Sequence, residues 1–377
     1  MSGERAHLAL ADGTTFEGVA WGATGDAVGE VVFTTGMTGY EEVLTDPSYC
    51  GQIVTMTAPQ IGNTGVTLDD AESVSGKPQV AGFLVRDASG CASNWRATET
   101  LDAYLARHGV VALSGIDTRR LTRHLRDHGS QNGALGTGDP AALVRRARAA
   151  PSMAGLDLVA RVTPKGAYAF TESRGAWGVG PSKPAERHVV AIDLGLKRHI
   201  LRCLVDAGCK VTAVPASTSA EAILALRPDG VFVSNGPGDP AAVTYAIDTV
   251  RALLGKTPLF GICLGHQLLA LALGGQTYKL KFGHRGVNQP VKDLATGRVE
   301  ITTQNHGFAV DVASLAGRAE TTHVHLNDAT SEGLAAPALR AFSVQYHPEA
   351  AAGPHDALYL FDRFTALIDE ARGASRA

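Results

Sequence analysis

The chain has 377 residues, 45% of them hydrophobic and 19% charged, and a formal net charge of −3 at pH 7. This length predicts two domains with a globular composition, and the nearly neutral charge argues against nucleic acid or an anionic membrane as partner. Five irregularly spaced cysteines, no signal-peptide core and no apolar run of the roughly 20 residues that span a bilayer predict a cytoplasmic protein.

The first part of the chain, residues 1–150, is predicted to be a separate β-rich α/β domain. Short β-type runs bounded by glycines and by Asp-Gly or Asp-Pro turns occur at 8–10, 15–19, 28–33 and 52–57. Leucines spaced i, i+4 among basic residues predict an amphipathic helix over 117–125. An Ala/Arg-rich helix is expected from Asp139-Pro140 to Ala150.

Residues 151–187 have a different character from the segments on either side. The stretch 171–184 contains several glycines, two prolines and two serines, and it shows no hydrophobic periodicity. This composition is typical of a linker, so we interpret 151–187 as the connection between two domains.

Residues 188–377 alternate strand and helix patterns. Apolar runs at 189–192, 211–214 and 230–233 are each followed by a helical pattern, which predicts a parallel sheet covered on both faces. Beyond residue 275 the segments are β-rich and typical of antiparallel strands, for example at 299–303 and 341–345, and a helix over 359–371 follows. The predicted fold class is therefore α/β, with an open, mixed and mainly parallel sheet whose site lies at the carboxyl ends of the strands.

A possible nucleophile stands between a strand and a helix in the segment Gly261-Ile262-Cys263-Leu264-Gly265-His266-Gln267. A glycine lies two residues to each side of Cys263, as in a nucleophile elbow, whose turn leaves no room for flanking side chains. The helix N-terminus there favours thiolate over thiol. A buried structural cysteine is the alternative and the usual role of a free cysteine, but the glycine spacing favours a nucleophile.

A thiolate nucleophile requires a base and a group that orients the base. His347 ends a β-type run, and Glu349 lies two residues further on, after a proline that fixes the local backbone. The chain has thirteen histidines, so this pair is a weak signal by itself. Together with the elbow it predicts a Cys263–His347–Glu349 triad, with His306 or His266 as alternative bases.

Acyl transfer also requires donors for a developing oxyanion. The N–H of Leu264 is one candidate, and the loop Ser234–Pro240, which follows a predicted parallel strand, is a second. This loop could also be an ordinary tight turn; it lacks the Gly-Lys-Ser/Thr ending of a phosphate loop. The remaining cysteines, which we interpret as structural, form no Cys-x-x-Cys pair, and no motif predicts a metal site.

These motifs together resemble the class I glutamine amidotransferases and, among them, the small subunits of carbamoyl-phosphate synthases. The resemblance rests on segments in both halves of the chain: Gly29–Phe33, Met37–Tyr40, Leu44–Tyr49, Gly115–Arg119, Ser234–Pro240, Phe260–Gln267, Lys281–Gly286 and Gln304–Val310. It implies that residues 188–377 are the amidotransferase domain and that 1–150 are the domain unique to these small subunits.

The resemblance also implies roles for individual residues. Cys263 attacks the carboxamide of glutamine to form a γ-glutamyl thioester, His347 transfers the proton and Glu349 orients His347. The residues implied to contact glutamine come from both parts of the chain: Ser48, Gly236, Gly238, Leu264, Gln267, Asn305, Gly307 and Phe308.

The partner implied by the resemblance is a separate large subunit, in a heterodimer or a higher oligomer of heterodimers. It receives ammonia and uses ATP and Mg²⁺ to make carbamoyl phosphate for arginine and pyrimidine biosynthesis, whereas this chain needs no cofactor. Three alternatives stay open on the sequence: an amidotransferase subunit of another synthetase, a cysteine-dependent α/β-hydrolase, and a non-catalytic binding subunit.

Overall fold

The structure is a computed structural model that describes residues 4–67, 69–178 and 182–374. The chain forms two compact units. The first extends to Leu156 and includes Lys281–Gly286, and the second comprises Asp157–Leu280 and Val287–Ala377. Most of the described residues of the stretch 151–187, interpreted from the sequence as a connection, therefore belong to the second unit, and residues 179–181 of that stretch lie outside the described residues.

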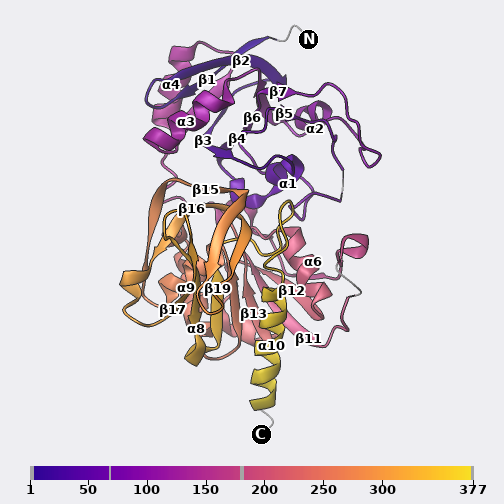
Figure 1. Ribbon diagram of the computed structural model, residues 1–377, viewed down its shortest axis with the longest axis vertical. Coiled ribbons are helices and arrows are strands. Elements are labelled where there is room, and N and C mark those ends of the chain that lie inside the picture. Colours follow the sequence, from indigo (N-terminus) through magenta and orange to yellow (C-terminus); the bar gives the residue numbers. More distant parts are fainter. Residues whose placement is uncertain (1–3, 68, 179–181, 375–377) are drawn as a thin grey trace. The chain divides into compact units, whose positions relative to one another are not determined.

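The first unit is built on a closed barrel in the strand order β1-β2-β8-β6-β4-β3-β9 (Figure 1). These strands are β1 (Arg5–Leu10), β2 (Thr15–Gly22), β3 (Ala27–Thr34), β4 (Gln52–Met56), β6 (Gly82–Leu84), β8 (Val111–Ser114) and β9 (Gln131–Gly136). The short strands β5 (Gln60–Ile61) and β7 (Asp87–Ala88) pair with each other. The four β-type runs expected before residue 60 fall in β1 to β4.

Alternation along the strands fills the barrel and covers its outside. Side chains of successive strand residues point to opposite faces, so Val31 and Ile53 belong to one apolar cluster while Val32 and Val54 belong to another. Both clusters also contain residues of the helices. Glycine makes room inside: a Cβ at Gly133 would lie 2.4 Å from Val31 Cγ2.

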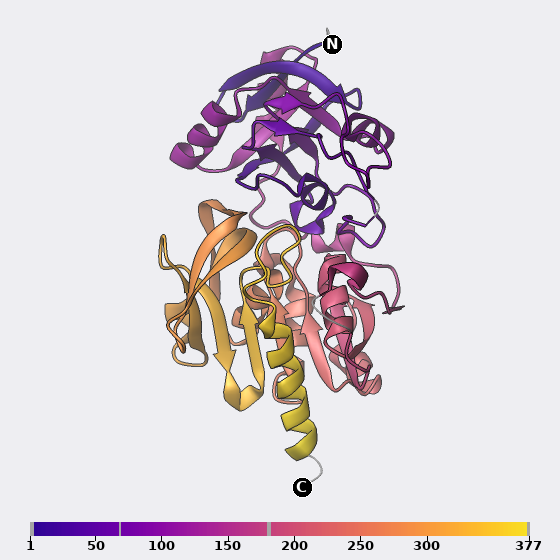
Figure 2. The same ribbon diagram turned by 45° about the vertical axis from the view of Figure 1, so that its right-hand side comes forward.

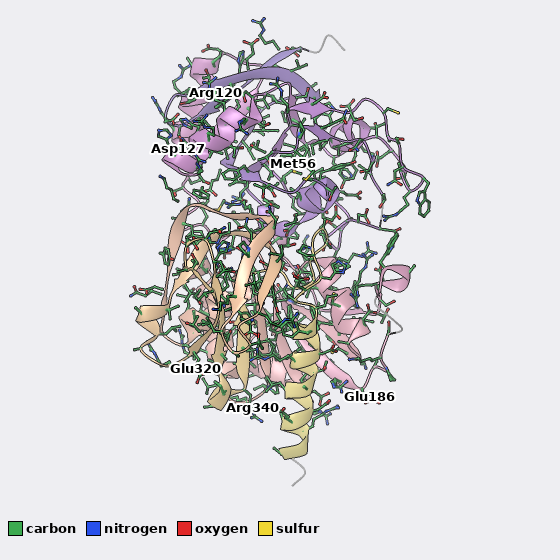
Figure 3. All side chains as sticks on the ribbon, viewed as in Figure 1. Met56, Arg120, Asp127, Glu186, Glu320 and Arg340 are labelled. Atoms are coloured by element: carbon green, nitrogen blue, oxygen red, sulfur yellow. The ribbon has the colours of Figure 1, made fainter. Side chains whose placement is uncertain are left out.

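The helices of the first unit are α1 (Tyr40–Thr45), α2 (Leu101–Arg107), α3 (Thr118–His128) and α4 (Pro140–Ala149), with a 3₁₀ turn at Pro47–Tyr49. Both helices expected from the sequence are confirmed. The Asp117 carboxylate caps α3 by accepting from Arg120 N at 2.9 Å. Arg120 and Asp127 lie on its exposed face (Figure 3).

The second unit contains one sheet of ten strands in the order β10-β12-β11-β13-β14-β19-β18-β17-β15-β16. Their bounds are β10 (Tyr168–Phe170), β11 (Arg187–Asp193), β12 (Cys209–Pro215), β13 (Gly230–Val233), β14 (Leu259–Ile262), β15 (Gln276–Asp293), β16 (Val299–Asp311), β17 (Glu320–His325), β18 (Ser331–Ala336) and β19 (Ala341–Val344).

The sheet is mixed, with its parallel strands in the middle. β12, β11, β13, β14 and β19 are parallel neighbours, whereas β10 pairs antiparallel with β12 and β18 pairs antiparallel with β19. The expected antiparallel role of 341–345 was therefore half wrong, because β19 is the last parallel strand on one side and the first antiparallel pair on the other.

Helices cover both faces of this sheet, as expected from the alternating pattern (Figures 1 and 2). α6 (Arg198–Asp206) and α10 (Tyr359–Ala374) pack on one face, and α7 (Ala220–Ala225), α8 (Thr244–Leu253) and α9 (Leu264–Ala272) on the other. The short α5 (Val159–Val162) precedes β10. Among the described residues, no helix combines the length and apolarity that crossing a membrane requires.

Candidate active site

The turn at Cys263 has the geometry of a nucleophile elbow. β14 ends at Ile262, α9 begins at Leu264, and Cys263 between them adopts φ 53° and ψ −102°, an uncommon conformation for a residue with a side chain. Its N–H donates to Val344 O at 2.9 Å, which fixes the turn to the end of β19. A strained backbone held by its surroundings is typical of functional sites.

Both glycines of the elbow are required by close contacts. A Cβ at Gly261 would lie 2.7 Å from Gly265 O, and one at Gly265 would lie 2.1 Å from Val233 O. The spacing of the two glycines is therefore explained by neighbouring backbone atoms, which leave no room for a side chain at either position.

We expect Gly265→Ala to lower the free energy of unfolding by roughly 3 kcal/mol, because the added methyl overlaps a backbone oxygen that cannot rotate away. Gly373→Ala is the control, since its Cβ would meet no atom within 4 Å and it lies in α10. Urea unfolding of both variants measures the effect, and equal stabilities would contradict the close packing at Gly265.

The Cys263 thiol is buried, with its residue 2% exposed, and its Sγ donates to Asn305 O at 3.7 Å. His347 follows β19, and its N–H donates to Thr303 O at 2.8 Å, which ties it to β16. Its Nδ1 pairs with Glu349 Oε1 at 2.7 Å. Nε2 is buried without a hydrogen bond of ordinary geometry, yet the ring is near enough to Cys263 for the two to interact. Catalytic hydrogen bonds often tighten only when substrate is bound.

Neighbouring charges set the protonation of His347 and Glu349. Burial lowers the pKa of His347, but the Glu349 charge and interactions with Cys263 and Glu349 outweigh it and raise that pKa to about 10. Burial raises the pKa of Glu349, and the charges of Lys197 and His347 overcome this and lower it to about 2. Glu349 therefore stabilises the protonated ring that forms when His347 takes the proton of Cys263.

Lys197, which no sequence motif identified, completes this arrangement. It is 3% exposed, and its Nζ donates to Glu349 Oε1 at 2.9 Å and to Ala350 O at 3.1 Å. Its position just beyond the carboxyl end of β11, where sites in such sheets lie, was the only sequence signal. Glu349 thus bridges one cation and one imidazole.

We expect Lys197→Met to lower the free energy of unfolding by about 3 kcal/mol, because it leaves a buried carboxylate with one partner fewer. The Glu349 pKa is depressed from 4.5 to about 2. Its contribution is therefore present above pH 4.5 and is lost as the pH falls toward 2, and the difference from wild type should shrink over that window.

Lys183→Met is the control for this prediction, since it breaks only the exposed ion pair with Asp362, worth about 0–1 kcal/mol. Denaturant unfolding at a series of pH values measures both variants. A Lys197→Met effect as small as that of the control, or one that grows in acid, would contradict the assigned charges.

The loop Ser234–Pro240 packs directly against the elbow. Gly265 N donates to Ser234 O at 3.0 Å, and a Cβ at Gly236 would lie 2.8 Å from Leu264 Cδ2. Gly238 has φ +89°, in the left-handed region. The two segments proposed as sources of oxyanion donors are therefore adjacent.

The other predicted contact residues divide between the two units. Gln267 Nε2 donates to Phe308 O at 2.8 Å and to Gln345 Oε1 at 3.0 Å, so α9 is joined to the part of β16 that holds Asn305, Gly307 and Phe308. Ser48 lies in the first unit, where its N–H donates to Asp46 Oδ1 at 2.8 Å.

The alternative bases have other partners. His266 Nδ1 bonds to Ser343 Oγ at 3.0 Å, and complete burial lowers its pKa to about 3. His306 bonds to Phe308 O at 2.9 Å through Nδ1 and to Gln304 Oε1 at 3.2 Å through Nε2. None of these three side-chain bonds is to Cys263, and His266 meets Cys263 only through its backbone N–H, which donates to Cys263 O at 3.1 Å, so His347 remains the best candidate.

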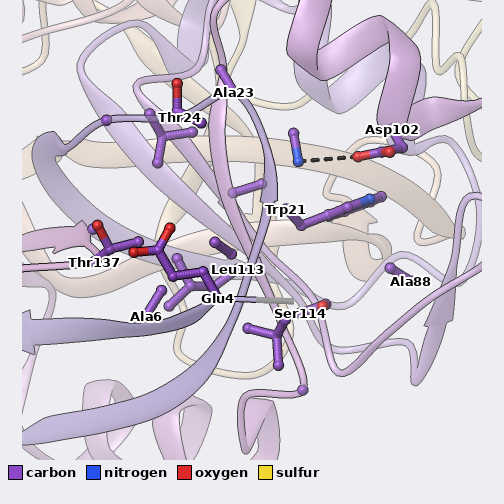
Figure 4. Close-up of a pocket in the computed structure, with 18 of the residues that line it drawn as sticks. Glu4, Ala6, Trp21, Ala23, Thr24, Ala88, Asp102, Leu113, Ser114 and Thr137 are labelled. Carbon is purple, nitrogen blue, oxygen red and sulfur yellow. Dashed lines mark hydrogen bonds between the residues drawn. The ribbon is translucent and has the colours of Figure 1, made fainter. Parts of the chain in front are cut away.

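A separate hollow of about 550 Å³ lies in the first unit, beside β2 and β8 (Figure 4). Trp21, Glu4, Asp102 and Thr137 are among its lining residues, and Gly22 N donates to Asp102 Oδ1. None of the described lining residues is a cysteine or a histidine, so the triad chemistry has no counterpart there.

Comparison with known proteins places the two parts of the chain. Residues 190–367 match the family Glutamine amidotransferase class-I, and residues 8–135 match the Carbamoyl-phosphate synthase small chain, CPSase domain. The second unit is therefore a class I glutamine amidotransferase domain.

Two relatives match nearly the whole chain, and both are carbamoyl phosphate synthase small chains. The carbamoyl phosphate synthase small chain of Syntrophotalea carbinolica is 57% identical over 375 residues, which cover 98% of this chain and 99% of the relative. That of Rubrivivax gelatinosus is 55% identical over 96% of this chain and 97% of the relative. The chain belongs to the family of carbamoyl phosphate synthase small chains, the glutamine amidotransferase subunits of that ligase.

Proposed function

We propose that this chain hydrolyses glutamine through a Cys263–His347–Glu349 triad and supplies the ammonia to a large, ATP-dependent carbamoyl-phosphate synthase subunit. The observation that carries the proposal is a buried imidazole, paired with Glu349 at 2.7 Å, beside the cysteine of a strained elbow. Nucleophile, base and orienting carboxylate are the parts that covalent acyl transfer requires.

In the proposed reaction Cys263 Sγ attacks the side-chain carboxamide carbon of glutamine, and the thiol proton passes to His347 Nε2. His347 returns this proton to the leaving nitrogen, so the C–N bond breaks, ammonia leaves and a γ-glutamyl thioester forms. Water then attacks the thioester while His347 accepts its proton. Glutamate leaves, and the proton restores the Cys263 thiol.

The charge that develops on the carbonyl oxygen needs donors fixed before reaction. Leu264 N and the Gly236 segment, joined by packing at the start of α9, are proposed to supply them. Glutamine is proposed to be held by Gly238, Gln267 and β16, where Asn305, Gly307 and Phe308 lie. Ser48 is proposed as a further glutamine contact on the family resemblance alone.

The ammonia is proposed to pass to a separate large subunit, which consumes bicarbonate and ATP with Mg²⁺ to form carbamoyl phosphate for arginine and pyrimidine synthesis. The proposal places both chains in the cytoplasm as a heterodimer, or a higher oligomer of heterodimers, without a cofactor in this chain. The family membership and the matched small-chain domain support this partnership.

The alternatives fit the chain less well. An amidotransferase subunit of another synthetase does not account for the match over residues 8–135. A cysteine-dependent ester hydrolase does not account for either family match. A non-catalytic binding subunit leaves the buried charges around His347 and Glu349 without a purpose, since burying charge is costly.

Glutaminase activity of this chain, measured with and without a purified carbamoyl-phosphate synthase large subunit, tests chemistry and partnership together. The expected result is glutamate release that rises when the large subunit is added, with simple esters not hydrolysed. Glutaminase activity absent under both conditions would contradict the proposal.

A further inference from the structure

The turn that delivers Lys197 to Glu349 is held by a buried carboxylate. Asp193, the last residue of β11, is 4% exposed, and its Oδ1 accepts from Gly195 N and Leu196 N, each at 2.9 Å. We call residues 194–197 the Lys197 turn. Its fixed backbone determines where the Lys197 side chain begins.

The same turn is joined to the loop that contains Gly236. Ser234 Oγ accepts from Leu194 N at 2.9 Å, and Asn235 Oδ1 accepts from Lys197 N at 3.1 Å. Asn235 Nδ2 donates to Gly195 O at 3.0 Å. A shift of the Lys197 turn would therefore disturb both the partner of Glu349 and the proposed oxyanion donors.

The second carboxylate oxygen of Asp193 faces away from the turn, toward the edge of the sheet. Its Oδ2 accepts from Tyr168 OH at 2.9 Å, and Tyr168 lies in β10, the edge strand paired with β12. Thr163 Oγ1, just after α5, donates to Asp193 O at 2.7 Å and accepts from Ala216 N at 2.9 Å. Burial raises the pKa of Asp193, while the bonds from Gly195 N, Leu196 N and the Tyr168 hydroxyl favour its charged form.

We propose that Asp193 is a positioning residue of the glutaminase site, and that Tyr168 couples the β10 segment to the catalytic carboxylate through it. The path runs from Tyr168 OH to Asp193, through the Lys197 turn to Lys197 Nζ, and from there to Glu349 and His347. This inference rests on the proposed glutaminase function. Movement of the β10 segment then changes the catalytic rate without touching glutamine.

A purely structural role for Asp193 predicts something different. Loss of a buried acceptor would then lower stability and leave turnover per folded molecule unchanged. A positioning role predicts a fall in kcat with little change in KM, because glutamine does not contact Asp193. It also predicts rescue by Asn, whose Oδ1 accepts the same two backbone N–H groups and whose Nδ2 can donate to the Tyr168 hydroxyl oxygen in place of the lost Oδ2 bond.

The test compares Asp193→Ala, Asp193→Asn and Tyr168→Phe in the complex with the large subunit, per folded molecule. Misplacing a catalytic group by about 1 Å costs on the order of 100-fold, so we expect Asp193→Ala to lower kcat roughly 10- to 100-fold. The expected loss is about 3- to 10-fold for Tyr168→Phe and less than about 3-fold for Asp193→Asn, with KM nearly unchanged in each variant.

Tyr245→Phe is the matched control, because Tyr245 OH donates to Asp157 Oδ2 at 3.1 Å, a similar bond in the same unit that does not involve the Lys197 turn. If Asp193→Ala does not fold, the comparison of kcat between Tyr168→Phe and Tyr245→Phe tests the proposal instead. Equal kcat in those two variants would overturn the proposal.

A second measurement separates this inference from the proposed function. The rate at which iodoacetamide alkylates Cys263 reports the thiol and its base without glutamine. If the wild type proves to lack glutaminase activity, the proposed function fails, yet slower alkylation in Tyr168→Phe than in Tyr245→Phe would still support positioning. Equal alkylation rates in the two variants would overturn it.

Discussion

Replacing Cys263 by Ser should abolish glutamine-dependent carbamoyl phosphate synthesis while leaving ammonia-dependent synthesis by the complex unchanged. Removing the nucleophile of a triad enzyme lowers kcat by roughly 10⁴- to 10⁶-fold, and a hydroxyl in this site has no base matched to its much higher pKa. The side chain is nearly the same size, so the strained elbow should survive the change.

The measurement is carbamoyl phosphate formed from glutamine and from ammonium in parallel, with Cys91→Ser as a control that removes an exposed thiol of the first unit. Loss of both activities would indicate that the complex no longer assembles. Glutamine-dependent synthesis at the wild-type rate would mean that Cys263 is not the nucleophile.

Replacing His347 by Asn should slow glutamine hydrolysis by about 10²- to 10⁴-fold, the usual contribution of a positioned acid–base group. Asn keeps a polar group near Glu349 but can neither accept the thiol proton nor return it to the leaving nitrogen. The loss should therefore appear mainly in kcat.

The variant should also show the linkage expected for a raised pKa. The His347 pKa rises from 6.5 to about 10, so its stabilising contribution is complete below pH 6.5 and is lost as the pH rises through 10. The stability difference between wild type and His347→Asn should be largest below pH 6.5.

His323→Asn is the control, because His323 is also buried, bonds to Thr322 Oγ1 at 2.9 Å and has its pKa lowered by burial to about 4. Steady-state kinetics of both variants decide between the histidines. A His347→Asn enzyme no slower than the His323→Asn control would assign the base elsewhere.

The local parts of the site were accessible from the sequence. Cys263 and its flanking glycines form a turn within seven residues, so their spacing predicts the elbow. His347 and Glu349 lie within three residues of each other, and this spacing predicts their pairing once the elbow is recognised. The structure confirms the elbow and the His347–Glu349 contact. Their roles in catalysis stay predictions.

Long-range contacts were not accessible in the same way. Lys197 meets Glu349 across 152 positions, and nothing near either residue marks the other. The barrel of the first unit closes through β1 and β9, with His7 opposite Gly136, and no local pattern specifies which distant strands pair. β19 was misread for a related reason, since one strand can be parallel to one neighbour and antiparallel to the other.

The most direct test of the account is mass spectrometry of the intact chain, quenched in acid during turnover with glutamine. The account predicts a γ-glutamyl adduct that maps to Cys263, disappears when glutamine is exhausted and is absent from Cys263→Ser. An adduct on any other residue, or steady glutamate release by the Cys263→Ser chain at the wild-type rate, would contradict it.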